Sequence, residues 1–191
     1  MHSILSHWES FYVIIGSAAA ALIGLQFVAS VLGAELRVVG GESITRAFGT
    51  PTIVHFGVVL LNAAFLSAPW PSASSVAILV GAFGAGGVLY TLLVARHARR
   101  QTIYKPVLED WIWHTIVPLA AYTSMLVSAI FLPGAPEQTL FGVAAAASLL
   151  LCTGIHNAWD SLNYIALRRR QAAADEARGK AEDAPGDAPN E

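Results

Sequence analysis

Long apolar stretches separated by short polar segments dominate this chain. Four stretches contain no Asp, Glu, Lys or Arg: residues 11–34, 47–95, 111–136 and 138–159. The second stretch is too long for a single membrane crossing, and its Pro69-Trp70-Pro71 sequence predicts a turn that divides it in two. A hydrocarbon core of about 30 Å requires roughly 20 apolar residues per helix, and each of the five resulting segments approaches this length.

The pattern therefore predicts an all-α fold, a polytopic transmembrane helix bundle with five spans. The expected spans are residues 11–33, 52–68, 74–96, 111–132 and 138–164, which together make one transmembrane domain over residues 1–170. Ala, Asp, Glu, Gly and Pro dominate residues 171–191. Because such a segment cannot bury enough apolar surface to fold alone, we expect it to be a disordered acidic tail.

The positive charges follow every second predicted helix. All 11 Lys and Arg residues lie at the end of the first, third or fifth span or in the segment that follows it, whereas the N-terminus and the other two turns have none. The positive-inside rule then places the N-terminus outside and the C-terminus in the cytoplasm. We expect a multi-pass protein of the bacterial inner membrane whose cytoplasmic face contacts anionic lipid headgroups.

Composition narrows the function classes. Of 191 residues, 55% are hydrophobic and 13% are charged, which leaves no room for a soluble catalytic domain beside five spans. No basic patch with interleaved aromatic residues is present, so nucleic-acid binding is not expected. Gly16, Ala20 and Gly24 form a small-residue ridge on the first helix. This ridge suits either packing within the monomer or the seam of a homo-oligomer, and both remain open.

Ionisable and amide side chains gather near the predicted cytoplasmic ends of the helices. Helical spacing puts several of them on shared faces, and we expect these faces to point inward because lipid exposure of polar groups is costly. The result is a predicted polar pocket near the cytoplasmic face. Its candidate residues are His55, Asn62, Asp110, His114, His156, Asn157, Asp160 and Tyr164.

Three interpretations of this pocket are open. The side chains can form a structural hydrogen-bond network between helices. They can handle a proton, an ion or a small polar ligand, because histidine and carboxylate together exchange protons near neutral pH. They can hold a haem or a transition metal in a redox protein, with His55, His114, His156 and Asp160 as ligands.

Sequence motifs favour the non-enzymatic interpretations. The chain lacks the His-x-x-x-His, His-Glu-x-x-His and Glu-x-x-His spacings of metal sites. A Gly-x-Ser-x-Gly elbow and a phosphate-binding loop are absent as well. No catalytic residue is therefore assigned.

Two segments carry a resemblance to known proteins. Residues 50–57 (TPTIVHFG) and 154–160 (GIHNAWD) resemble segments of small, uncharacterised bacterial multi-pass membrane proteins. The resemblance covers the five predicted helices and not the tail. It implies a membrane location and a helical bundle, and no activity comes with it.

Overall fold

A computed structural model of the chain describes residues 1–34, 50–100 and 108–182, and this described part is helical and contains no strand. The prediction of an all-α fold is therefore confirmed. The elements are α1 (His2–Ser6), α2 (Glu9–Ala34), α4 (Thr50–Leu66), α5 (Ala73–Arg100), α6 (Leu108–Trp111), the π-helix η2 (Ile112–Ile116), α7 (Val117–Phe131) and α8 (Pro136–Glu182).

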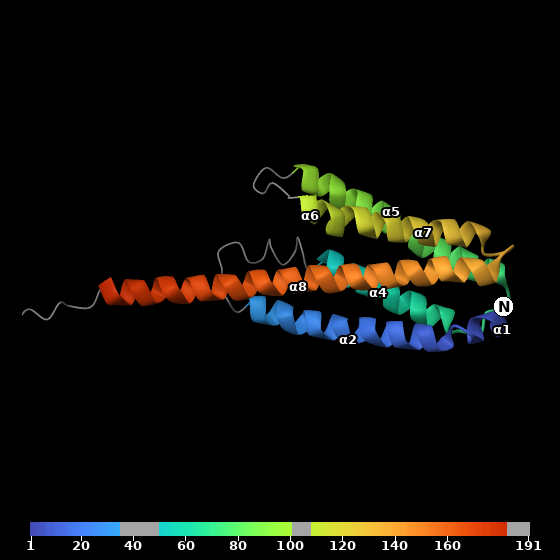
Figure 1. The fold of residues 1–191 in the computed structure, drawn as a ribbon, viewed down its shortest axis with the longest axis horizontal. Coiled ribbons are helices and arrows are strands. Elements are labelled where there is room, and N and C mark those ends of the chain that lie inside the picture. The colour runs from blue at the N-terminus through green and yellow to red at the C-terminus, as the bar shows by residue number, and fades with distance from the viewer. Residues whose placement is uncertain (35–49, 101–107, 183–191) are drawn as a thin grey trace, which may run out of the picture.

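Two antiparallel helix pairs are joined by α8. Helix α2 packs along α4, and α5 packs along α7. Helix α8 lies between the two pairs and contacts α7, α4 and α2 (Figure 1). The N-terminus, the α4–α5 turn and the α7–α8 turn share one end of the bundle, here called the N-terminal end, and α8 extends beyond the opposite end (Figure 1).

Small residues set the distances between the helices. A Cβ atom on Gly84 would lie 2.7 Å from the backbone nitrogen of Leu126, so glycine is required for α5 to approach α7 this closely. The predicted ridge on α2 divides into two parts. A Cβ on Gly16 would lie 2.9 Å from the Cβ of Ala63, whereas Gly24 has nothing within 4 Å. Intramolecular packing thus accounts for the Gly16 end of the ridge and not for Gly24.

Four helices in the described residues are long and apolar enough to cross a membrane: Glu9–Val31, Ala73–His97, Ile112–Phe131 and Pro136–Asn163. The fifth expected span, 52–68, corresponds to α4, which begins at Thr50 and has 17 residues. At 1.5 Å per residue it is roughly 26 Å long, somewhat short of a hydrocarbon core. Helix α4 ends early because the chain turns back before Pro69, and the Trp70 indole N–H donates to the Phe65 carbonyl at 2.6 Å.

The first part of the tail, for which disorder is expected from the sequence, is helical in the structure, where α8 continues to Glu182. The segment 171–182 is rich in Ala, the strongest helix former, and Asp175 and Arg178 are spaced for an i,i+3 pair. It also extends a helix that already exists, so it avoids the cost of nucleation. Residues 183–191 lie outside the described part of the chain.

Apolar side chains fill the bundle at its N-terminal end. Leu66 at the end of α4, Leu132 just after α7 and Leu140 in the first turns of α8 are each at most 1% exposed. Trp8 and Phe141 stack edge to face with their ring centroids 4.7 Å apart. Polar exceptions at this end are Tyr12 and Ser128, which are 1% and 7% exposed.

Candidate functional site

A buried hydrogen bond connects α4 to α7. His55 Nδ1 and the Tyr122 hydroxyl oxygen are 2.9 Å apart, and the two residues are 2% and 0% exposed. Gly87 on α5 makes room for the tyrosine, because a Cβ atom there would overlap the Tyr122 ring. Sequence patterns singled out His55 but not its partner.

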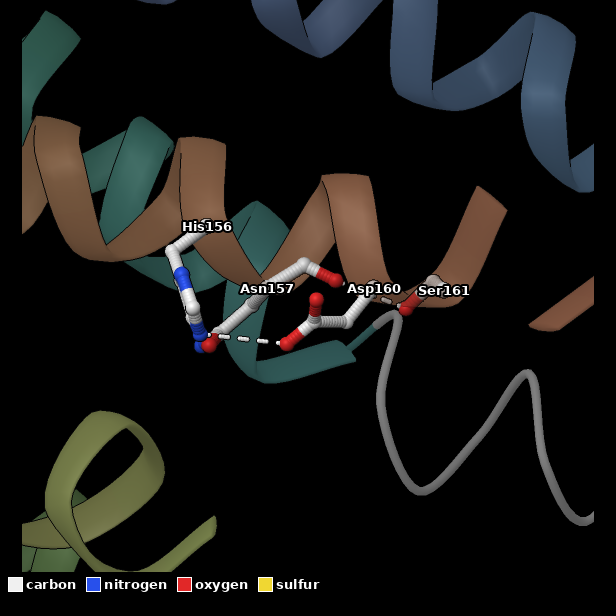
Figure 2. A network of polar contacts seen from close by, with 4 residues as sticks. All are labelled: His156, Asn157, Asp160 and Ser161. Atoms are coloured by element: carbon white, nitrogen blue, oxygen red, sulfur yellow. Dashed lines mark hydrogen bonds and ion pairs between the residues drawn. The ribbon is translucent and has the colours of Figure 1, made fainter. Parts of the chain in front are cut away.

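A second histidine is held between α8 and η2. His156 Nε2 lies 3.1 Å from Asp160 Oδ2, one helical turn further along α8 (Figure 2). The other contact of the imidazole is with Trp113 of η2, whose ring is stacked at 4.1 Å between centroids and 21° between planes. The side chains of His156 and Asp160 are 26% and 53% exposed, so this pair lies at the edge of the bundle and can meet solvent or headgroups.

Two asparagine side chains are enclosed in the bundle. Asn62 on α4 and Asn157 on α8 are 0% and 1% exposed. Within the described part of the chain, neither side-chain amide has a hydrogen-bond partner, and the same holds for His55 Nε2. A buried polar group left unsatisfied costs about 1–3 kcal/mol. Native proteins keep few such groups, and each one calls for a specific explanation.

His55, Asn62, Tyr122 and Asn157 are together called the polar core. All four are at most 2% exposed, and they come from α4, α7 and α8; Asn62 lies about two turns from His55 along α4, toward the N-terminal end. Gly154 connects two of these helices, because its missing Cβ gives space to the Phe56 ring. Phe56 follows His55, and Asn157 is one turn beyond Gly154. The contact between α4 and α8 therefore brings these two polar side chains to nearby levels of the bundle.

The third histidine, His114, lies in the fourth predicted span, where a π-helix precedes the α-helix α7. Residues Ile112–Ile116 form a π-helix, and Pro118 follows at the start of α7. Proline has no N–H and its ring clashes with the carbonyl four residues earlier, here that of His114, so the wider turn relieves the clash. The His114 side chain is partly buried on η2.

The structure locates the remaining candidates as follows. On α8 the inward face carries Asn157, while His156 and Asp160 lie beside it, toward η2. Asn163 is seven residues beyond His156 and so shares its helical face, and it is exposed. Asp110 lies on α6 and Tyr164 on α8, but their side chains are outside the described part of the structure.

Sequence reasoning missed two residues of this site, Tyr122 and Trp113. A signal for Tyr122 exists, because a tyrosine amid an apolar span needs a hydrogen-bond partner when it is buried. Trp113 lies near the expected start of the fourth span, where tryptophan is common simply because it sits at headgroup depth. Its stacking on His156 occurs within the π-helix, and the sequence gives no sign of that geometry beyond Pro118.

The metal interpretation gains no support from this arrangement. Among the residues that the structure describes, no group of three or more His, Cys, Asp and Glu side chains is placed to hold a metal ion. His55 is engaged with Tyr122, while His156 is engaged with Asp160 and Trp113.

Comparison with known proteins does not assign this chain to a protein family. No protein-family model, no curated protein and no solved structure matches the chain significantly. The helices and their composition support a membrane protein, since four of them can cross a bilayer by length and apolarity.

Proposed function

We propose that the protein is a five-span protein of the bacterial inner membrane with its N-terminus outside. Helix α4 counts as a span because 17 residues lie at the lower limit for crossing, and it is packed between α2 and α8. The cytoplasmic side is the end of the bundle where α5 finishes with Arg96 and Arg99 and where α8 continues to Arg169 and Arg170 (Figure 1).

Within this topology, the proposed function is binding of a proton or a small polar ligand in the polar core, entered from the cytoplasmic side. The observation that carries the proposal is the set of buried nitrogen and oxygen atoms without partners on His55, Asn62 and Asn157. A ligand with hydrogen-bond donors or acceptors would recover the cost of burying them. Polar groups kept inside a membrane bundle are commonly functional for this reason.

Binding from one side fits the bundle better than conduction through it. The half toward the N-terminal end is filled by apolar residues such as Leu66, Leu132 and Leu140. At the other end, the His156–Asp160 pair, with side chains 26% and 53% exposed, lies next to η2 and is the proposed side of entry. The local departure from α-helix there is the kind of irregularity that often occurs at functional sites.

Two measurements on protein in lipid nanodiscs test the proposal. In the first, thermal unfolding is followed with ammonium, urea, acetamide and acetate as probes. A probe that occupies the site at 100 times its Kd stabilises the folded state by about 2.7 kcal/mol. We expect stabilisation in the wild type and not in Asn157→Leu.

The matched control is Thr153→Val, one turn earlier on α8. Thr153 is as buried as Asn157, but its hydroxyl already donates to the Leu149 carbonyl at 2.8 Å, so this variant should keep probe binding. The second measurement is infrared difference spectroscopy between pH 8 and pH 5, in which an imidazolium band lost in His55→Gln shows proton uptake in the core. If no probe stabilises the protein and no such band exists, the polar core is a structural network and the proposal is wrong.

A further inference from the structure

A groove separate from the polar core opens between α5 and the η2–α7 segment. It has a volume of about 710 Å³ and is lined by Leu92, Leu93, Ala95, Arg96, Arg99, Thr115 and Leu119. The leucines form its wall, and the two arginines lie at the end of α5. A site of this kind combines an apolar trough with a positively charged rim.

Within the part of the chain that the structure describes, no acidic side chain pairs with the arginines of the rim. Arg96 and Arg99 are exposed and lie one turn apart on α5, so their side chains share a face. The Arg99 guanidinium lies 5.3 Å from the centre of the Trp111 ring, and this cation–π contact fixes its position while leaving its hydrogen-bond donors available.

In the proposed topology, the groove lies where α5 leaves the apolar part of the membrane. The apolar part of α5 ends at His97. Leu92 and Leu93, one turn deeper than Arg96, are 50% and 54% exposed. A molecule lying in the groove would therefore meet leucine side chains on the hydrocarbon side and guanidinium groups on the polar side.

From this geometry we propose that the groove binds one anionic phospholipid, with its phosphate between Arg96 and Arg99 and an acyl chain against Leu92, Leu93 and Leu119. Guanidinium groups bind phosphate oxygens through paired hydrogen bonds, and basic pockets between helices on the cytoplasmic side hold anionic headgroups. The inference rests on the proposed topology and is independent of what the polar core binds.

Quenching of Trp111 fluorescence by brominated lipid tests this site directly. In a variant of the full chain, Trp111 is kept as the single tryptophan, and the other four are changed to Phe (Trp8, Trp70, Trp113 and Trp159). This variant is placed in phosphatidylcholine vesicles. Dibrominated phosphatidylglycerol or dibrominated phosphatidylcholine is then added at the same mole fraction. We expect markedly stronger quenching by the anionic lipid, because a lipid bound in the groove would hold its bromine atoms next to Trp111.

The double variant Arg96→Gln/Arg99→Gln is expected to lower the relative binding constant for the anionic lipid about 25-fold, which follows from roughly fivefold for each arginine near the membrane surface. The control is Arg169→Gln/Arg170→Gln, which removes the same charge from exposed positions on α8 and should keep the preference. Equal quenching by the two lipids in the wild type, or equal loss in both double variants, would overturn the proposal, because only bulk surface charge would be acting.

Inorganic phosphate distinguishes a lipid site from an anion site. We expect 10 mM phosphate to leave the preference for phosphatidylglycerol unchanged, because phosphate lacks the chain that covers the leucines. Loss of the preference would assign the rim to a free anion and refute the lipid proposal. Probe binding in the polar core is measured separately and does not depend on Arg96 or Arg99, so failure of one site is distinguishable from failure of the other.

Discussion

The hydrogen bond between His55 and Tyr122 provides a quantitative test of the polar core. The variant Tyr122→Phe removes a single oxygen atom and keeps a ring that is 0% exposed, so the packing against α5 is preserved. It also leaves both ring nitrogens of His55 without a partner, because Nε2 has none in the described structure. The change therefore isolates one polar contact between α4 and α7.

The size of the effect follows from the burial of the pair. Hydrogen bonds between membrane helices contribute about 0.6 kcal/mol on average and up to about 1.7 kcal/mol. An unsatisfied buried group costs about 1–3 kcal/mol. We therefore expect Tyr122→Phe to lower the free energy of unfolding by about 1–2 kcal/mol. In a His55→Leu background the tyrosine hydroxyl has already lost its partner, so the same change should be neutral or slightly stabilising.

The assay is a double-mutant cycle measured by equilibrium unfolding in mixed micelles of dodecyl maltoside and sodium dodecyl sulfate, followed by circular dichroism. The expected coupling energy is about 0.6–1.7 kcal/mol. Tyr90→Phe is the control, since this half-buried tyrosine on α5 makes no hydrogen bond in the described structure, and it should change stability by less than about 0.5 kcal/mol. A coupling energy of zero within error would refute the argument, because the contact would then contribute nothing.

Two further predictions concern the glycines that create space for the polar core. Gly87→Ala should destabilise the protein by about 1–3 kcal/mol, because the added Cβ overlaps the buried Tyr122 ring, whereas Gly86→Ala meets open space and should be neutral or slightly stabilising in the same micelle assay. Gly154→Ala should cost a similar amount through overlap with Phe56, while Gly57→Ala, with nothing within 4 Å, should not. Equal effects within either pair would contradict the helix spacing derived from these contacts.

The positions of the helices could be predicted well from the sequence because apolar stretches and charges mark their ends. The expected span 11–33 lies within Glu9–Ala34, and 74–96 lies within Ala73–Arg100. The segments that deviate have local causes. Helix α4 is bounded by Pro69, and α8 continues to Glu182 because alanine propagates a helix that has already formed.

The partners of the site residues could not be predicted, because spacing on one helix says nothing about rotation against its neighbours. His156, Asp160 and Asn163 share a face by spacing, yet the buried residue of this part of α8 is Asn157. Its orientation depends on Gly154, whose missing Cβ lets Phe56 of α4 pack against α8. Tyr122 became part of the site for a similar reason, since Gly87 leaves space for its ring.

The close packing and the unpaired polar atoms of this bundle are two consequences of the same contacts. Gly154 and Gly87 allow such close contact between the helices that Asn157 and His55 are enclosed. A leucine in place of Asn157 or His55 would avoid the free-energy cost of burying a polar side chain. A purely structural network would be expected to pair these atoms with one another. Instead His55 Nε2 and both atoms of each asparagine amide have no partner within the described residues. The bundle therefore keeps hydrogen-bonding capacity at a cost in stability, and this capacity is what a proton or a polar ligand would use.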